Sequence, residues 1–189
     1  MYRILTIDGG GIRGLFAAVL LDRLENHKPF LHTIDLFGGT STGGIIALGL
    51  ASGLKPAALV ALYRDNGKLI FRDTFLDDVK DLKVILGADY DNEPRLMLLR
   101  RIFGDKKLND IKKRVIIPSF DLDNEKSNFR TWKPKFFHNF PGADSDGDER
   151  IVDVAMRTSA APTYFPSYQG FIDGGVVANN PSMAALAQA

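Results

Sequence analysis

The chain has 189 residues, of which 45% are hydrophobic and 25% charged, the balance of a globular domain with enough apolar material for a core. Its 24 basic and 23 acidic residues leave a net charge of +1, so the composition offers no case for nucleic-acid binding or for a polybasic membrane anchor. The absence of cysteine excludes disulfides, thiolate metal sites and a cysteine nucleophile.

The N-terminal segment favours a cytoplasmic protein. Residues 1–7 have neither the charged start, nor the long apolar stretch, nor the small-residue cleavage site of a secretory signal peptide. No apolar run in the sequence reaches the roughly 18 residues that a membrane-spanning helix needs. We therefore expect a cytoplasmic location, with any membrane contact being peripheral.

Strand-like and helix-like segments alternate in the first third of the chain. A short apolar run predicts a buried strand, and a glycine-rich turn leads from it into apolar residues at helical spacing. A second, less regular strand pattern is broken by two glycines and followed by two helices, the later one closed by Asn66-Gly67. In order, the predicted elements are strand 3–7, helix 15–24, strand 30–37, helix 45–51 and helix 56–66.

The rest of the chain continues this alternation. Residues 121–150 are the exception, because aromatic residues alternate there with Asn, Lys and Pro, which predicts one or two short strands and a loop. Asn180 and Pro181 are residue types typical of a helix N-cap and a first helical position. The predicted elements are helix 94–103, strand 114–120, helix 151–158, strand 171–172 and a helix from residue 181. The whole pattern indicates an α/β fold with a mostly parallel sheet.

The pentapeptide Gly39-Thr40-Ser41-Thr42-Gly43 fits the G-x-S-x-G pattern and lies between a predicted strand and a predicted helix. A tight strand-to-helix turn would expose Ser41, and only glycine fits where the backbone is crowded. The helix N-terminus would also favour negative charge on the serine oxygen, by about 0.3–1 kcal/mol. A plain glycine-rich turn is the alternative. The flanking elements favour Ser41 as a nucleophile, with Gly39, Thr40, Thr42 and Gly43 forming its turn.

A second glycine-rich turn, Asp8-Gly-Gly-Gly-Ile-Arg-Gly14, follows the first predicted strand. Bare backbone N–H groups in such a turn can form an oxyanion hole, in which one donor is worth about 2.7–4 kcal/mol of barrier. The same spacing of glycines can hold a dinucleotide pyrophosphate. Asp35, 21 residues after Gly14, has the spacing of the acidic residue that a dinucleotide site needs, but it lies inside a strand-like run. A nucleotide- or phosphate-binding protein is therefore the alternative function, and it leaves Ser41 unexplained.

The base that would serve Ser41 cannot be a histidine in the usual chain order of Ser, Asp and His. The three histidines, His27, His32 and His138, all precede Asp173, which begins an Asp-Gly-Gly turn after a predicted strand. His138 could act only in a different order. A carboxylate that acts directly is a chemical alternative, while a plain turn aspartate is the competing interpretation of Asp173.

Four further signals favour structural interpretations. The acidic run at 144–148 lacks the glycine and glutamate positions of a calcium loop, so we expect a solvated loop and no metal site. The basic cluster within 106–114 is expected to be a solvated face rather than a patch for lipid headgroups. The aromatic residues of 129–140 are expected to be core rather than a lid over lipid chains. The apolar run from Leu96 to Leu99 is expected to be helix core.

Taken together, the motifs resemble those of the patatin-like phospholipases. The resemblance rests on Asp-Gly-Gly-Gly-Ile-Arg-Gly at 8–14, Gly-Thr-Ser-Thr-Gly-Gly at 39–44 and Asp-Gly-Gly at 173–175, with 159–166 similar to the family segment that precedes the aspartate. Family domains commonly continue well past Asp-Gly-Gly, whereas this chain stops 14 residues after Gly175. Residues 1–189 are therefore predicted to be one patatin-like phospholipase domain, with its completeness at the C-terminal end left open.

The resemblance implies a three-layer α/β/α sandwich and a Ser–Asp dyad, with Ser41 as nucleophile and Asp173 as general base. It implies hydrolysis of phospholipids or other acyl lipids through an acyl-enzyme, without metal or cofactor and with peripheral membrane contact; it gives no oligomeric state. Because no imidazole bridges such a dyad, we predict a hydrogen bond between the two side chains, direct or through water. The resemblance assigns the oxyanion hole chiefly to Gly9, Gly10 and Gly11, with Arg13 and Gly14 beside them, and the turn after the aspartate to Gly174 and Gly175.

Overall fold

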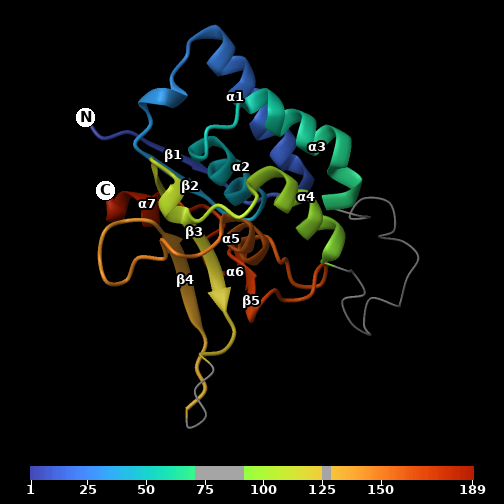
Figure 1. Cartoon of the computed structure of the whole chain (residues 1–189), viewed down its shortest axis with the longest axis vertical. Coiled ribbons are helices and arrows are strands. Elements are labelled where there is room, and N and C mark those ends of the chain that lie inside the picture. The colour runs from blue at the N-terminus through green and yellow to red at the C-terminus, as the bar shows by residue number, and fades with distance from the viewer. Residues whose placement is uncertain (71–91, 125–128) are drawn as a thin grey trace.

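The computed structural model describes residues 1–70, 92–124 and 129–189, which fold around a five-stranded sheet (Figure 1). β1, β2 and β3 lie side by side and parallel, whereas β4 and β5 both run antiparallel to β3. The strands are β1 (Ile4–Ile7), β2 (Leu36–Gly39), β3 (Arg114–Asp121), β4 (Lys133–His138) and β5 (Phe171–Asp173). The sheet is thus mixed, with three of the five strands parallel.

The pairing of β3 with two other strands brings the end of β2 close to the end of β5. β2 pairs with the first residues of β3, and β5 pairs with its last residues, from Ser119 to Asp121. Because β5 is antiparallel, its last residue, Asp173, lies opposite Ser119 and nearest to β2. The end of β2 and the end of β5 therefore approach each other, although more than 130 residues separate them in the sequence.

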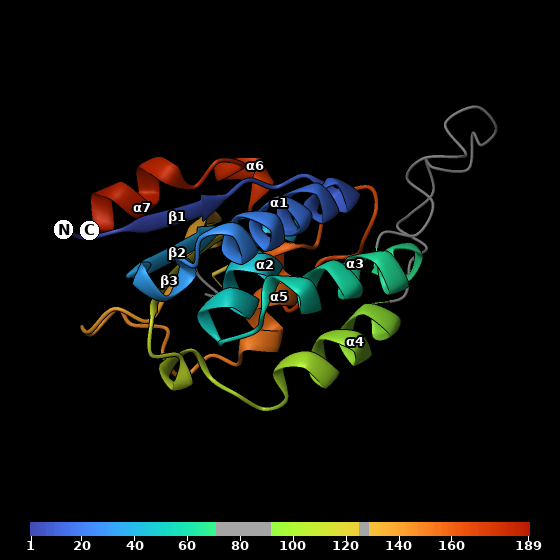
Figure 2. The same ribbon diagram turned by 90° about the horizontal axis from the view of Figure 1, so that it is seen from above.

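Helices cover both faces of the sheet, and Figure 2 shows the two helical layers on either side of it. One face carries α1 (Gly14–His27), α2 (Thr42–Ala51), α3 (Pro56–Ile70), α4 (Glu93–Phe103) and α5 (Ile151–Thr158). The opposite face carries the much shorter α6 (Gly175–Ala178) and α7 (Ser182–Gln188). The three-layer α/β/α sandwich that the sequence predicts is confirmed, with unequal outer layers.

α2 is the centre of the main core. All ten of its residues are buried, and its apolar residues surround the helix rather than forming one stripe, as in a helix enclosed by protein. On the opposite face, Ala185 of α7 packs with Leu36 and Ile116 in a smaller core. Since Ser41 immediately precedes α2, its position is set by the most enclosed helix of the domain.

The predicted strand 30–37 is wrong in its first half. Residues Leu31–Thr33 form a 3₁₀ turn, and β2 begins only at Leu36. The Glu25 carboxylate accepts hydrogen bonds from the backbone N–H groups of Phe30 and Leu31, at 2.8 and 3.0 Å. Those donors are therefore not available to a neighbouring strand, even though their side chains pack against the core.

Two predicted helix ends also differ from the structure. α3 continues through Gly67, where a Cβ atom would lie 2.9 Å from Ile12 Cδ1, so this glycine allows close packing rather than ending the helix. α7 begins at Ser182, whose N–H donates to Asn180 Oδ1 at 3.0 Å. The predicted N-cap at Asn180 is therefore one residue too early, because Pro181 is the N-cap, although the Asn180 side chain still accepts the first N–H of the helix. The short helix α6 before it was not predicted.

The aromatic stretch 129–140 divides into two parts. Phe137 is buried in the main core, and Phe136 and Phe140 pack against the smaller core, as predicted. Phe129 and Trp132, however, are 75% and 70% exposed, so the core prediction is wrong for them. Both residues precede β4, in the segment that leads into this strand from β3.

The apolar run on α4 is core only on one side of the helix. Leu96 and Leu99 are buried as predicted, but Met97 is 56% exposed, because successive helical residues cannot all face the same neighbour. The same helix buries Arg95, which the sequence analysis did not single out.

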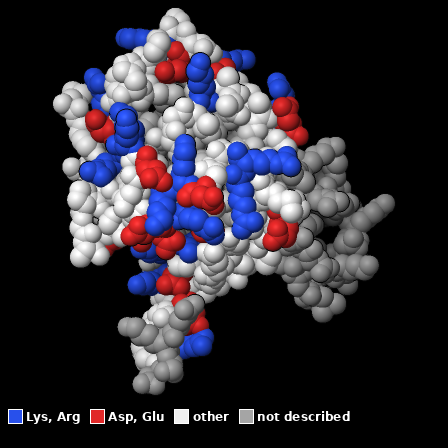
Figure 3. All heavy atoms as spheres, in the orientation of Figure 1, with Lys and Arg blue, Asp and Glu red and all other residues white. Residues whose placement is uncertain are grey.

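The charged segments are largely surface features. Lys107 pairs with Asp148 at 3.0 Å, and both side chains are at least half exposed. Asp146 differs from the predicted solvated loop, because its side chain is only 12% exposed, pairs with Lys135 and accepts the His138 N–H. Figure 3 shows basic and acidic side chains interspersed on one face of the molecule. Within residues 1–70, 92–124 and 129–189, no group of acidic and histidine side chains could hold a metal ion.

In the part of the chain that the structure describes, no helix combines the length and the apolar character needed to cross a bilayer.

The enclosed position of α2 predicts a strong dependence of stability on its side chains. Leu48 is fully buried, so Leu48→Ala should lower the free energy of unfolding by about 2–5 kcal/mol through the cavity that it leaves. Leu186 on α7 is 62% exposed, so Leu186→Ala is the matched control and should change stability by about 0.5 kcal/mol or less. Urea unfolding of both variants measures the difference, and equal losses would contradict this view of the core.

Candidate active site

Ser41 occupies a strained turn between β2 and α2. Its backbone has φ 56° and ψ −124°, a conformation rare for a residue with a side chain. The backbone N–H of Ser41 donates to Thr158 Oγ1 at 3.0 Å, and Thr158 in turn donates to the carbonyl oxygen of Pro118 at 2.6 Å. The turn is therefore held from α5 and β3, two elements far away in the sequence.

The glycines around Ser41 are required by close backbone contacts. A Cβ atom on Gly39 would lie 2.1 Å from the carbonyl oxygen of Gly43, and one on Gly43 would lie 2.2 Å from the carbonyl oxygen of Ile7. Gly44 is similarly close to the Thr158 side chain, at 2.8 Å. At Gly39 and Gly43 no larger residue fits without moving backbone. This agrees with the tight turn predicted for residues 39–43, which we call the Ser41 elbow.

The two threonines of the elbow support the turn from behind. Thr40 is fully buried, and its hydroxyl donates to the carbonyl oxygen of Ala178 at 2.7 Å. The Thr42 hydroxyl donates to Tyr63 at 2.7 Å, and the Tyr63 hydroxyl donates to the Thr42 carbonyl at 2.9 Å. Burial raises the pKa of Tyr63 above its ordinary range, so this phenol stays a neutral donor. Thr40 and Thr42 therefore position the turn without facing the pocket.

The glycine-rich turn after β1 lies directly beside Ser41. A Cβ atom on Gly9 would be 3.3 Å from the Ser41 Cβ atom and 2.4 Å from Asn179 Oδ1. The N–H of Gly9, however, donates to the carbonyl oxygen of Asn179 at 3.0 Å, so it is not free to face an oxyanion. Gly11 has φ +57°, which favours glycine. Of the predicted oxyanion residues, Gly10 and Gly11 are thus better placed to offer backbone donors than Gly9.

Arg13 and Gly14 have different positions in this turn. Arg13 lines the pocket, and its backbone N–H and its side-chain Nε both donate to the carbonyl oxygen of Gly10 at 3.2 Å. That carbonyl belongs to the same peptide group as the Gly11 N–H, so Arg13 fixes the direction of this donor. Gly14 is buried at the start of α1, where a Cβ atom would meet Thr42 Oγ1 at 2.2 Å. Gly14 thus permits the packing of α1 on α2 and does not line the pocket.

Asp173 is the last residue of β5 and is buried, with only 5% of its surface exposed. Its Oδ1 atom accepts the Gly175 N–H at 2.7 Å, whereas Oδ2 is buried and has no hydrogen-bond partner among the described residues. A Cβ atom on Gly174 would lie 2.2 Å from the carbonyl oxygen of Pro118, which explains the glycine after the aspartate. Both glycines of the Asp-Gly-Gly turn therefore serve to place this carboxylate.

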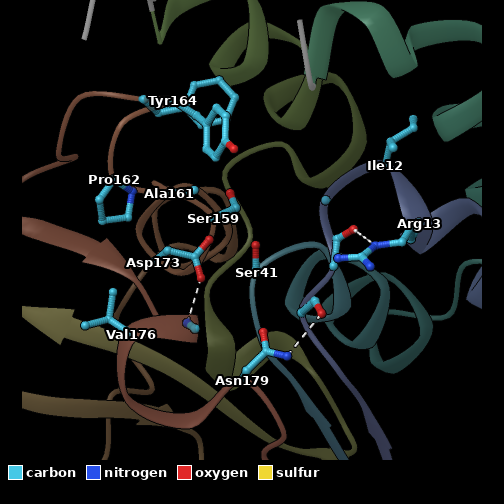
Figure 4. A pocket seen from close by; sticks show the side chains of 15 residues that line it. Ile12, Arg13, Ser41, Ser159, Ala161, Pro162, Tyr164, Asp173, Val176 and Asn179 are labelled. Atoms are coloured by element: carbon cyan, nitrogen blue, oxygen red, sulfur yellow. Dashed lines mark hydrogen bonds between the residues drawn. The ribbon is translucent and has the colours of Figure 1, made fainter. Parts of the chain in front are cut away.

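Ser41 and Asp173 project into the same pocket (Figure 4). Burial raises the pKa of Asp173 above its ordinary range, and the nearby Ser41 hydroxyl, the Gly175 N–H and the positive charge of Arg95 each oppose that rise. Among the described residues, no hydrogen bond of ordinary geometry joins the two side chains, and Asp173 Oδ2 remains unpaired. The Ser41 hydroxyl nevertheless lies near enough to lower the pKa of Asp173 through a side-chain hydrogen-bond interaction, so the two side chains are in direct contact rather than separated.

The pocket between these side chains has a volume of about 680 Å³ and is open to solvent. Figure 4 shows that its walls come from the glycine-rich turn, the Ser41 elbow, the segment after α5 and the start of α6. Tyr164 and Val176 are both lining residues and about half exposed. The lining residues are Gly9, Gly10, Gly11, Ile12, Arg13, Ser41, Ser159, Ala161, Pro162, Tyr164, Phe165, Asp173, Gly175, Val176 and Asn179.

None of the three histidines is among these lining residues. His138 is buried on β4, where its Nε2 atom lies 3.7 Å from Asp144 Oδ2. Asp35 precedes β2 and accepts the backbone N–H of Arg3 at 2.8 Å, so it lies at the end of the strand away from the glycine-rich turn. A dinucleotide site needs its acidic residue at the other end, which argues against that alternative.

Sequence reasoning missed two residues of the site. Asn179 lines the pocket, and its Nδ2 atom donates to the carbonyl oxygen of Gly9 at 3.3 Å. Two adjacent asparagines before Pro181 were a signal, but only the second was interpreted, as a helix cap. Arg95 does not line the pocket, but from α4 it contacts the lining residues Ser159 and Phe165, and an arginine inside an apolar helix stripe was the signal for it.

A family model described as patatin-like phospholipase matches residues 5–186 of the chain. The chain belongs to the patatin-like phospholipase family. This membership accounts for the order of the three motifs, and it agrees with a pocket formed by the glycine-rich turn, the serine elbow and the Asp-Gly-Gly turn.

Several curated proteins resemble the chain over most or nearly all of its length. The cGAMP-activated phospholipases of Escherichia coli and Vibrio cholerae are 37% and 38% identical to it over 97% of its residues, which correspond to 54% and 56% of those proteins. Patatin-17 of Solanum cardiophyllum is 31% identical over 89% of the chain and 44% of its own length. The chain thus spans about half the length of the curated relatives that it matches.

The fold is also found in a solved structure of low sequence identity. A chain in the complex of full-length SpcU with full-length ExoU, from the type III secretion system of Pseudomonas aeruginosa, has a TM-score of 0.50 and 17% identity. The match covers 87% of this chain and 39% of that chain. It supports the patatin-like architecture alone.

The environment of Asp173 predicts a specific dependence of stability on pH. Because its pKa is raised in the folded state, ionising Asp173 costs folding free energy. That contribution favours the folded state below the unfolded pKa and is lost as pH rises through the folded pKa. Asp173→Asn keeps the shape but carries no charge, so it should be more stable than the original protein at neutral pH, with a difference that shrinks in acid. Urea unfolding across this range measures it, and a less stable Asp173→Asn at neutral pH would contradict it.

Proposed function

We propose that the chain hydrolyses fatty-acyl ester bonds of lipids, with Ser41 as nucleophile and Asp173 as general base. The observation that carries this proposal is the meeting of a serine on a strained elbow with a buried, half-unpaired carboxylate in one pocket beside bare glycine backbone. Strained backbone and unpaired buried polar atoms are costly, and they are often found at active sites. Family membership supports the same chemistry.

In the first step, the Ser41 oxygen attacks the ester carbonyl carbon while its proton passes to the Asp173 carboxylate. Asp173 Oδ2 has free lone pairs to accept that proton. The carbonyl oxygen becomes an oxyanion, for which the N–H groups of Gly10 and Gly11 are the proposed donors. The ester C–O bond then breaks, and the leaving alkoxide takes the proton from Asp173, which leaves an acyl group on Ser41.

In the second step, water attacks the acyl carbon and gives its proton to Asp173. Collapse of the second tetrahedral intermediate releases the fatty acid and returns the proton to Ser41. The raised pKa of Asp173 suits this role, because a carboxylate of ordinary acidity would be a weak base for a serine hydroxyl. Arg13 supports the oxyanion donors by holding the Gly10 carbonyl.

For the substrate, we propose phospholipids or related acyl lipids met at a membrane surface. The walls of the pocket include apolar side chains, and Tyr164 and Val176 are partly exposed at it, where they could contact acyl chains. Peripheral contact of this surface with a bilayer is part of the proposal, as is a cytoplasmic location. Both remain predictions from the sequence and the family.

The nucleophile and base can be tested by substitution. Ser41→Ala should lower kcat for short- and long-chain acyl esters and for phospholipids by about 10,000-fold or more, and Asp173→Asn by about 1,000-fold or more. Ser145→Ala, on a loop that does not line the pocket, is the control and should hydrolyse at the original rate. Hydrolysis by Ser41→Ala at the original rate would end the assignment.

A serine-directed phosphonate tests the nucleophile independently of substrate choice. Mass spectrometry should find one adduct, on Ser41. Ser159 is the other serine of the pocket, but its hydroxyl donates to the carbonyl oxygen of Ala155 at 2.6 Å. An adduct on Ser159 instead of Ser41 would identify Ser159 as the nucleophile and contradict the assignment. Binding of a dinucleotide together with no adduct at all would instead favour the nucleotide-binding alternative.

A further inference from the structure

Arg95 is a fully buried cation that the proposed reaction does not use directly. It lies in the first turn of α4 and is only 1% exposed, whereas Arg100 and Arg101 on the same helix are exposed. A buried charge is costly unless it is paired and hydrogen-bonded, so its position calls for a physical account.

The contacts of Arg95 lead to the wall of the pocket. Its Nη1 atom donates to the carbonyl oxygen of Ser159, and its Nη2 atom donates to Asn92 Oδ1 at 3.0 Å. The guanidinium carbon lies 4.0 Å from the centre of the Phe165 ring, a cation–π geometry. Ser159 and Phe165 both line the pocket, so Arg95 holds the segment between them at both ends.

Arg95 also acts on Asp173 through its charge. Burial lowers the pKa of Arg95 to about 10, and the negative charge of Asp173 and the Tyr168 hydroxyl oppose that decrease. Arg95 is therefore still a cation at neutral pH. In return, its charge lowers the pKa of Asp173, against the larger effect of burial. Arg95 Nε has no hydrogen-bond partner among the described residues, so the cation is incompletely neutralised by local contacts.

The other charged groups nearby have partners of their own. On α5, Asp153 pairs with Arg150 at 2.7 Å, and Arg157 pairs with Glu149 at 2.9 Å. Tyr168 donates its hydroxyl to Asp153 at 2.9 Å.

Among the described residues, Arg13 is the other cation that lines the pocket with Asp173, and its Nε donates to the carbonyl oxygen of Gly10. The described groups that contact Asp173 itself are neutral. On β3, Ser119 lies opposite Asp173, but its hydroxyl donates to the carbonyl oxygen of Ile172. The Ser41 hydroxyl and the Gly175 N–H are uncharged dipoles. Arg95 is thus the cation, among the residues that the structure describes, whose charge lowers the pKa of this carboxylate.

We propose that Arg95 is a positioning residue of the active site, which holds the pocket wall from Ser159 to Phe165 and keeps Asp173 in the ionised form that can accept the Ser41 proton. This inference rests on the proposed function, because it assigns Arg95 to the base of that reaction. Arg95 is not a lining residue of the pocket, and it acts through the pocket wall and through the field at Asp173. A cation supplied from α4 would oppose the cost of burying the base beside the nucleophile.

The test separates charge from packing through a pH profile of kcat/KM for a short-chain nitrophenyl ester. Arg95→Gln removes the cation, so the acid limb of the profile should move to higher pH. The plateau value of kcat/KM should also fall, by up to about 100-fold through misplacement of the pocket wall. Arg95→Lys keeps a cation but loses the paired hydrogen bonds, so its acid limb should stay nearer to the original while its plateau falls. A purely structural arginine would lower the plateau in both variants without moving the limb.

Two further variants control for misfolding and for nonspecific effects of charge. Asn92→Asp adds a carboxylate beside the guanidinium while keeping Arg95, so it should move the acid limb in the same direction as Arg95→Gln. Arg101→Gln removes an exposed charge from the same helix and should leave the profile unchanged. Carbon-13 NMR titration of the Asp173 carboxyl in the original protein and in Asn92→Asp provides the same comparison without turnover.

The outcomes are distinguishable from failure of the proposed function. If the original protein hydrolyses the ester but neither Arg95→Gln nor Asn92→Asp moves the acid limb, the inference about Arg95 is wrong and the dyad stands. If Arg95→Gln does not fold, an unchanged limb in Asn92→Asp overturns the inference by itself. If the original protein neither hydrolyses esters nor forms the Ser41 adduct, the proposed function fails, and the NMR titration still decides whether Arg95 controls Asp173.

Discussion

The candidate site depends on one constraint, the close approach of backbone where the turn after β2 meets the end of β1. Gly43 lies so near the carbonyl oxygen of Ile7 that a Cβ atom would be 2.2 Å from it, and the N–H of Thr40 donates to the same carbonyl at 3.2 Å. With the turn held there, and with Thr158 accepting its N–H, Ser41 has to adopt its left-handed conformation. The enclosed helix α2 then prevents the turn from relaxing.

A second feature of the site is a balance between two buried charges. Asp173 resists ionisation because it is buried, and Arg95 resists protonation for the same reason, while each favours the charged form of the other. Such a pair is poor for stability when compared with apolar packing. The pair is understandable if the proposed function needs a carboxylate that is both ionised and basic beside Ser41. Stability is then given up locally for reactivity, as is common at active sites.

The mixed sheet has a direct part in this arrangement. In a wholly parallel sheet, the strand that carries Asp173 would have to run alongside β2 or β3 in the same direction for its end to lie beside theirs. Here the short antiparallel β5 pairs with the last residues of β3 and fills the space beyond β2. This topology lets an aspartate late in the chain reach an early serine without a bridging histidine.

The sequence by itself determined the elements and the chemistry that local patterns encode: the alternation of strands and helices, the glycines that permit close backbone contact, and Ser41 and Asp173 as candidate residues. It could not determine where strand 30–37 begins, because hydrogen bonds from the backbone N–H groups of Phe30 and Leu31 to the Glu25 carboxylate compete with strand pairing. Only the tertiary structure decided that Gly9 donates to Asn179, that Gly14 packs against α2, and that Arg95 is buried with a hydrogen bond to the Ser159 carbonyl. Those facts arise from contacts between segments that are distant in the chain, and no periodicity or motif records such contacts.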